Sequence, residues 1–264
     1  MYAFEHHAAT SLEDAVAKLK ANDEAKILSG GQTLIPTLKQ RLAAPSMVID
    51  LAKLDALCGI EKKGNSIVIG AMTRHVDVAN SPVVQGALPG LAALAGNIGD
   101  PHVRNRGTIG GSVANNDPAA DYPAACLALG ATIVTNARRI AADDFFAGLF
   151  VTALEDNEII TAIEFPVVEK FNYQKFPNPA SRYAMVGVGV AKSGGSVKVA
   201  VTGAGNDGVF RWSEAEAALS ANFSGTALNG LSVDASALNG DIHASPDYRA
   251  HLIGVLTKRA VAAL

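Results

Sequence analysis

Two glycine-containing segments carry the residue types that bind a phosphate group. The first reads Ser29-Gly30-Gly31-Gln32-Thr33-Leu34 and connects a short apolar strand to a predicted helix. Glycines let the backbone approach a ligand closely, and successive N–H groups at a helix start converge on an anion. Ser29 and Thr33 add hydroxyl donors. The alternative is a tight strand-to-helix turn without a ligand, which is favoured for this segment taken alone.

The second segment strengthens the phosphate hypothesis. It begins Thr108-Ile109-Gly110-Gly111-Ser112 and ends Asp117-Pro118-Ala119-Ala120-Asp121, so adjacent glycines again stand beside hydroxyls, with two carboxylates that can accept from ribose. Two such loops in one domain fit a pyrophosphate, because each loop can donate to one side of it. The basic residues at 102–106 just before the segment face phosphates, a partner chain or solvent, and the sequence leaves these alternatives open.

A third glycine segment matches the dinucleotide-binding fingerprint literally. Gly203-Ala204-Gly205-Asn206-Asp207-Gly208 follows a predicted strand, and Asp234 lies downstream. However, no convincing strand leads to Asp234, and too little chain remains to complete a parallel sheet. We therefore predict a turn at residues 206–208.

The other residues capable of chemistry do not form a catalytic or metal site. His6 and His7 are adjacent, so they cannot share one face of a helix or strand. Two cysteines are too few for an iron–sulfur cluster, which normally takes four thiolates. Cys126 lies in an apolar run and is predicted to be a core residue. We expect no catalytic and no metal-binding residues in this chain.

The elements around these segments indicate an α+β fold in two parts. Apolar spacing predicts helices at residues 12–19, 34–42, 83–95 (divided near Pro89), 123–129, 213–219 and 247–263. Strands are predicted at residues 25–28, 47–49, 66–70, 131–134, 158–165, 183–191 and 196–203. Residues 96–121 are expected to form a long functional loop, and Thr73 to cap a short helix. The pattern changes near residues 168–172, where we place a boundary.

Composition excludes several classes of protein. The chain has 264 residues, of which 49% are hydrophobic and 18% charged, so it is not intrinsically disordered. Its 22 basic and 25 acidic residues leave no basic stripe for nucleic acid. No apolar stretch reaches the roughly 18 residues that span a membrane. The N-terminus lacks the pattern of a signal peptide, and a cytoplasmic location is expected.

Residues 29–36 and 107–121, together with residues 68–73 and 173–183, carry a resemblance to a known family. They resemble the FAD-binding medium subunits of molybdenum hydroxylases, as in carbon monoxide dehydrogenase and xanthine dehydrogenase. The resemblance covers nearly the whole chain. It implies a PCMH-type FAD-binding domain over residues 1–168, with subdomains at about 1–55 and 56–168. A smaller C-terminal domain of antiparallel sheet and helices would follow at 169–264.

The resemblance also implies a noncovalently bound FAD whose pyrophosphate lies between the two loops. The loop residues concerned are Ser29, Gly30, Gly31, Gln32, Thr33 and Leu34 in the first loop and Thr108, Ile109, Gly110, Gly111 and Ser112 in the second. Asp121 would bind the adenosine ribose, Lys175 would lie near the flavin ring, and Ile109 would lie closest to the isoalloxazine. Gln32 and Ser112 depart from residues common in the family, yet both keep hydrogen-bonding groups.

The function implied is that of an electron-relay subunit. A flavin accepts electrons singly and releases them in pairs, so it suits transfer from iron–sulfur clusters to an external acceptor such as quinone, NAD or oxygen. Molybdopterin would lie on a large partner subunit and [2Fe-2S] clusters on a small one, in a dimer of heterotrimers. Two alternatives stay open: a standalone FAD-dependent oxidoreductase of the same fold, and a flavin-free scaffold subunit.

Overall fold

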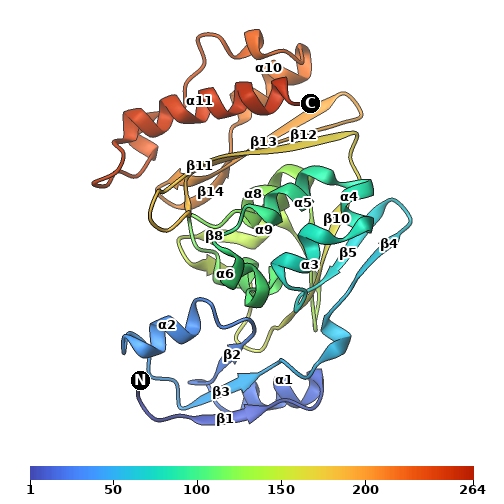
Figure 1. Ribbon diagram of the computed structural model, residues 1–264, viewed down its shortest axis with the longest axis vertical. Coiled ribbons are helices and arrows are strands. Elements are labelled where there is room, and N and C mark those ends of the chain that lie inside the picture. Colours follow the sequence, from blue (N-terminus) through green and yellow to red (C-terminus); the bar gives the residue numbers. More distant parts are fainter.

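The computed structural model describes residues 1–264, which stack in three layers along the longest axis of the molecule (Figure 1). We call these layers the N-terminal unit (residues 1–57), the central unit (residues 58–168) and the C-terminal unit (residues 169–264). Each unit contains its own sheet and its own cluster of buried apolar side chains. No helix is both long enough and apolar enough to cross a lipid bilayer.

The N-terminal unit is a small parallel sheet with two helices. Its strands β1 (Glu5–Ala8), β2 (Lys26–Leu28) and β3 (Met47–Asp50) pair in the order β1-β3-β2, with α1 (Leu12–Ala21), α2 (Leu34–Lys39) and the 3-10 turn η1 (Asp55–Leu57). Ser11 caps α1 by accepting a hydrogen bond from the backbone N–H of Asp14. This start of α1 agrees with the sequence prediction.

The strand β1 was not predicted, because its residues Glu5-His6-His7-Ala8 show no apolar alternation. It forms by adding in parallel to β3. His6 contacts Asp50, whereas His7 contacts Asp14 at the start of α1. The two imidazoles therefore serve different contacts, as expected for neighbours on a strand.

The central unit is built on an antiparallel sheet in the order β4-β5-β10-β6-β7. Its strands are β4 (Ile60–Lys63), β5 (Ser66–Gly70), β6 (Thr132–Thr135), β7 (Arg139–Ala141) and β10 (Ile160–Pro166), with a short hairpin of β8 (Phe146–Gly148) and β9 (Val151–Thr152). Its helices are α3 (His75–Asn80), α4 (Pro82–Ala87), α5 (Pro89–Gly96), α6 (Pro101–Arg106), α7 (Ile109–Asn115), α8 (Tyr122–Leu129) and α9 (Ala142–Phe145). Every residue of α8 is buried, including Cys126, because the C-terminal sheet covers this helix.

Two expectations for the central unit were wrong. Residues 96–121 are not one long loop, because they contain α6 and α7. Asp100 caps α6 by accepting from the N–H of Val103, and Thr108 caps α7 by accepting from the N–H of Gly111. Thr73 does not cap a helix, since Arg74 precedes α3 and the Thr73 hydroxyl bonds the backbone of Gly59.

The C-terminal unit is a four-stranded antiparallel sheet with helices on one face. The strands β11 (Lys170–Pro177), β12 (Ala184–Ser193), β13 (Ser196–Gly205) and β14 (Gly208–Arg211) pair in sequence order, and α10 (Ser213–Ala221), α11 (Pro246–Ala262) and the turns η2 (Gly225–Leu228) and η3 (Ala235–Ala237) follow. The strands predicted at residues 183–191 and 196–203 are present as β12 and β13, which form a hairpin with its turn at residues 193–196. Its glycines take the left-handed backbone that such a turn requires. The other face packs on α8, so the α+β prediction is confirmed.

Candidate cofactor-binding site

The two predicted glycine loops meet at the seam between the N-terminal and central units. The Ser29 hydroxyl, directly after β2, lies 2.6 Å from the Thr108 hydroxyl before α7. At Gly30, an added Cβ would lie 2.2 Å from the carbonyl oxygen of Arg106, so only glycine allows this approach of the two backbones. The structure therefore brings together two segments that lie about 80 positions apart.

The first loop offers a row of unused backbone donors. The N–H groups of residues 29–33 donate to no other group of the chain. Gly31 adopts a left-handed backbone with φ of 73°, which turns the chain between the end of β2 and the start of α2. The side chains of Gln32 and Thr33 are exposed, and those of Ser29 and Leu34 are half-buried. Unpaired N–H groups in such a turn form a concave donor surface for an anion.

The second loop is held more firmly against the central unit. The N–H groups of Ile109 and Gly110 donate to the backbone oxygens of Thr73 and Ala71. A Cβ on Gly110 would lie 2.5 Å from that of Ala71. Ile109 is fully buried in the central core, so this structure does not support its expected position beside the isoalloxazine. Gly111 and Ser112 are half-buried and follow on the first turn of α7.

Asp121 and Lys175 are brought together, each by a different unit. Asp121 precedes α8 and is 5% exposed, and the side chain of Lys175 on β11 is 1% exposed. Their carboxylate and ammonium groups are 3.0 Å apart, and the Tyr173 hydroxyl donates to the other carboxylate oxygen at 2.5 Å. Burial raises the pKa of Asp121, while Lys175 and Tyr173 oppose this by stabilising the charged carboxylate.

Sequence reasoning missed Tyr173, although a signal for it was present. Tyr173 stands two residues before Lys175 on the same strand, so both side chains point to the same face of the sheet. Lys175 also donates to the backbone oxygen of Asn97 at the end of α5. Lys175 of the C-terminal unit therefore has two partners in the central unit, the Asp121 carboxylate and the Asn97 carbonyl.

A cavity of about 580 Å³ adjoins the contact between the two loops. Ser29, Gly30 and Thr108 lie on its wall, and Arg74 and Arg106 add positive charge. The Arg74 guanidinium is paired with Asp77 through two hydrogen bonds. Arg106 is the residue of the basic segment 102–106 that lines this cavity, whereas the imidazole of His102 points into solvent.

The third glycine segment is a turn, as predicted. Gly205 pairs with Gly208 where β13 and β14 form a hairpin. A Cβ on Gly203 would lie 2.4 Å from the carbonyl oxygen of Ala184, so this glycine serves strand packing. Asp234 caps the short turn η3 by accepting from the N–H of Ser236. The segment packs on η3, where the N–H of Asn206 donates to the carbonyl of Ala237.

No group of three or more histidine, cysteine or acidic side chains lies close enough to hold a metal ion. Cys58 is exposed and Cys126 is buried, and burial raises the pKa of the Cys126 thiol far above its usual range. The buried thiol is therefore an apolar core group, as its sequence surroundings predicted.

Comparisons with known proteins agree with this arrangement. Residues 2–168 match the family described as the FAD binding domain in molybdopterin dehydrogenase. The chain is 37% identical to the carbon monoxide dehydrogenase medium chain of Hydrogenophaga pseudoflava, over 98% of this chain and 96% of the relative. It is 35% identical to the nicotine 6-hydroxylase medium subunit of Paenarthrobacter nicotinovorans, over 95% of this chain and 93% of that relative.

Solved structures give the same result for the fold. A chain of reconstituted CO dehydrogenase from Oligotropha carboxidovorans superimposes with a TM-score of 0.90 at 33% identity, over 99% of this chain and 97% of that one. The fold and the sequence therefore define a flavoprotein component of an oxidoreductase. The chain belongs to the family of FAD-binding medium subunits of molybdenum hydroxylases, and its FAD-binding domain matches residues 2–168.

Proposed function

We propose that this chain relays electrons through a noncovalently bound FAD, from iron–sulfur clusters on a partner subunit to an external acceptor. The row of unpaired N–H groups at residues 29–33, in the loop that contacts Thr108 through Ser29, is the observation that supports this most directly. Backbone donors beside glycines are the usual means of holding a pyrophosphate. When bound, FAD supplies the exchange of electrons, both singly and in pairs.

We assign the pyrophosphate to the first loop, residues 29–34, and the second loop, residues 108–112. The first loop would donate through its free N–H groups. The second would contribute the Ser112 hydroxyl, because the N–H groups of residues 109–112 already donate within the central unit. The two loops therefore have different roles: one donates to the ligand and the other supports the cleft.

Asp121 and Lys175 are proposed for the adenosine ribose and the flavin ring, respectively. Both oxygens of Asp121 already accept hydrogen bonds, so a ribose hydroxyl would share this carboxylate with Tyr173 or Lys175. Charged acceptors bind hydroxyl donors more strongly than neutral ones do, which suits this shared arrangement.

We also infer the domain division and the partners. The sheets of the three units fall within residues 5–50, 60–166 and 170–211, which supports a division into residues 1–168 and 169–264, with a subdivision near residue 56. Relatives that match over nearly their whole length are named medium chains or medium subunits. This supports a complex with a large molybdopterin subunit and a small [2Fe-2S] subunit, arranged as a dimer of heterotrimers.

FAD titration of the purified full chain tests this proposal. We expect the flavin absorbance to remain with the protein after gel filtration. Gln32→Glu adds a negative charge beside the free N–H groups and is expected to weaken FAD binding about fivefold, which corresponds to about 1 kcal/mol. Gln40→Glu adds the same charge at the other end of α2 and serves as the control.

Three other outcomes would count against the proposal. A chain that retains no flavin after addition of FAD would be a scaffold. Reduction of the bound flavin by NAD(P)H or a substrate in the absence of partners would indicate a standalone oxidoreductase. Purification of the native complex without a molybdenum subunit and a four-cysteine small subunit would remove the relay role.

A further inference from the structure

The chain joins its first two hydrophobic cores through two adjacent residues. Ile159 is 4% exposed and belongs to the core of the N-terminal unit, although the strand that follows it belongs to the central unit. Ile160, the first residue of β10, belongs to the central core. Neighbouring side chains on an extended chain point to opposite sides, so this dipeptide bridges the two units.

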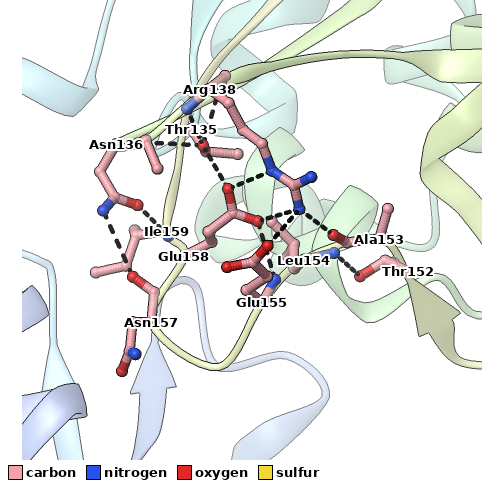
Figure 2. Close-up of polar contacts among 11 residues, drawn as sticks. Thr135, Asn136, Arg138, Thr152, Ala153, Leu154, Glu155, Asn157, Glu158 and Ile159 are labelled. Carbon is pink, nitrogen blue, oxygen red and sulfur yellow. Dashed lines mark hydrogen bonds and ion pairs between the residues drawn. The ribbon is translucent and has the colours of Figure 1, made fainter.

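A network of hydrogen bonds fixes the turn just before this dipeptide (Figure 2). The Glu158 carboxylate is 4% exposed and accepts from Arg138 twice, from Nε at 2.8 Å and from Nη2 at 2.9 Å. It also accepts from the Thr135 hydroxyl and from the N–H of Glu155. The Arg138 hydrogen bonds lower the pKa of Glu158 to about 2, so the carboxylate stays charged at ordinary pH.

The same network reaches the bridging residue itself. The side chain of Asn136 accepts from the N–H of Ile159, and the N–H of Asn136 donates to the carbonyl of Ile159. Arg138 also donates to the carbonyl of Ala153 at 2.7 Å. Figure 2 shows Arg138 extending from the turn between β6 and β7 over the segment 153–159. Thus the hairpin of the central unit holds both ends of this segment.

We propose that Arg138 and Glu158 are positioning residues that set the width of the cofactor cleft. They hold the segment 153–159, which inserts Ile159 into the N-terminal unit and so orients the first glycine loop toward the second. This inference rests on the proposed function, because it takes FAD to lie between the two loops. Neither side chain touches the loops, so their effect on FAD passes through the orientation of the two units.

Arg138→Gln tests this positioning role in the full chain. We expect FAD to bind roughly 3- to 30-fold more weakly, the range typical of residues that couple to a site without touching the ligand. Arg138→Lys keeps the charge and one donor, and is expected to recover part of the affinity. Arg139→Gln is the matched control, because the neighbouring Arg139 pairs with Glu164 on the exposed side of the sheet and reaches neither Glu158 nor the segment 153–159.

The FAD-binding assay uses conditions under which urea unfolding shows each variant to be fully folded without FAD. General destabilisation then cannot produce the change in FAD affinity. If Arg138→Gln does not fold, Glu158→Gln provides the milder change, since it keeps the size and one acceptor of the side chain. Wild-type affinity in a folded variant, or an equal loss in Arg139→Gln, would overturn the proposal.

A second measurement separates this inference from the function itself. Spin labels on cysteines placed at the exposed Lys20 in α1 and Lys62 in β4, with Cys58 changed to serine, report the orientation of the two units without FAD. We expect Arg138→Gln to broaden the distance distribution and Arg139→Gln to leave it unchanged. If wild type binds no FAD, the proposed function fails while the distances still decide the positioning role; an unchanged distribution overturns it.

Discussion

The two seams between the units of this protein are built differently. At the seam between the central and C-terminal units, the central hydrophobic core continues into the C-terminal sheet through Phe171 and Ala200, and a buried ion pair joins Asp121 to Lys175. At the seam between the N-terminal and central units, two glycine loops touch through hydroxyls and backbone, and N–H groups remain unpaired. The unpaired N–H groups of the loosely packed seam therefore suit the pyrophosphate. At the other seam only the Asp121–Lys175 pair is proposed to contact the cofactor, and apolar packing holds the units together.

The largest expected effect comes from breaking the ion pair of the packed seam. Lys175→Met leaves the Asp121 carboxylate buried without its cation, which typically costs about 3–5 kcal/mol of folding free energy. Urea unfolding of the variant measures this loss. Lys63→Met removes an exposed lysine paired with Glu61 and should change stability by about 0.5 kcal/mol or less. A loss below about 1 kcal/mol for Lys175→Met would mean that apolar packing alone holds this seam.

Acid should weaken the loosely packed seam through His75. Its backbone N–H donates to the carbonyl of Gly107, at the base of the second loop, and its ring packs against that of Tyr122 with centroids 5.4 Å apart and planes tilted by 47°. Burial lowers the pKa of His75 from 6.5 to about 4, with a smaller contribution from Arg104. Between these values the unfolded chain takes up a proton that the folded chain does not, so folding stability falls as pH falls from 6.5 to 4.

The full effect over that range is about 3 kcal/mol, from the size of the shift. Urea unfolding at pH 7 and pH 4.5 measures it in wild type and in His75→Phe, which cannot titrate. We expect the variant to lose less stability than wild type over this interval. His243→Phe, at an exposed position, keeps the wild-type dependence because His75 is still present. Equal pH dependence in wild type and His75→Phe would contradict the assignment.

A smaller effect is expected from closing the space that glycine leaves in the second loop. In Gly110→Ala the new methyl group would lie within 2.5–2.8 Å of three atoms of Ala71, so backbone must move. Overpacking of this kind costs about 1–3 kcal/mol, and the shifted loop should bind FAD more weakly. Gly86→Ala in α4 meets no atom within 4 Å and should be neutral or slightly stabilising. FAD titration and urea unfolding of both variants check this; wild-type behaviour of Gly110→Ala would show that the loop is not constrained.

The sequence predicted the helices and strands at both seams better than the contacts that these elements make with one another. The helices α1 and α11 were identified because burial of one face gives them apolar periodicity, and the strands β12 and β13 because burial of both faces makes them long apolar runs. The polar strand β1 and the short helices α6 and α7 were not. The strand β1 forms because it pairs with β3, and the helices α6 and α7 begin at single caps, Asp100 and Thr108. Apolar periodicity detects neither a pairing partner nor a single cap.

The candidate site shows the same division. The two glycine loops were found because their residue types and order carry chemical information. The pairing of Asp121 with Lys175 joins positions 54 residues apart and depends on how the C-terminal sheet packs against α5 and α8, which no local pattern contains. The proposed positioning role of Arg138 could not be predicted from the sequence either. Its partner Glu158 belongs to a turn whose importance becomes visible only once Ile159 is seen in the core of another unit.

The smallest expected effect is the coupling between the two hydroxyls that join the loops. Ser29→Ala and Thr108→Ala each remove one partner of the 2.6 Å contact, and Thr108→Ala also removes the cap of α7. Loss of the cap lowers stability equally in the Thr108→Ala variant and in the double variant, so it cancels in a double-mutant cycle. The remaining coupling energy between the two hydroxyls is expected to be about 0.5–1.5 kcal/mol. Urea unfolding measures this coupling without FAD, and the same cycle in FAD titration measures how much the bound ligand changes it. A larger coupling with FAD would mean that the ligand draws the loosely packed seam together; an equal coupling would mean that the seam already has its final shape before the cofactor enters.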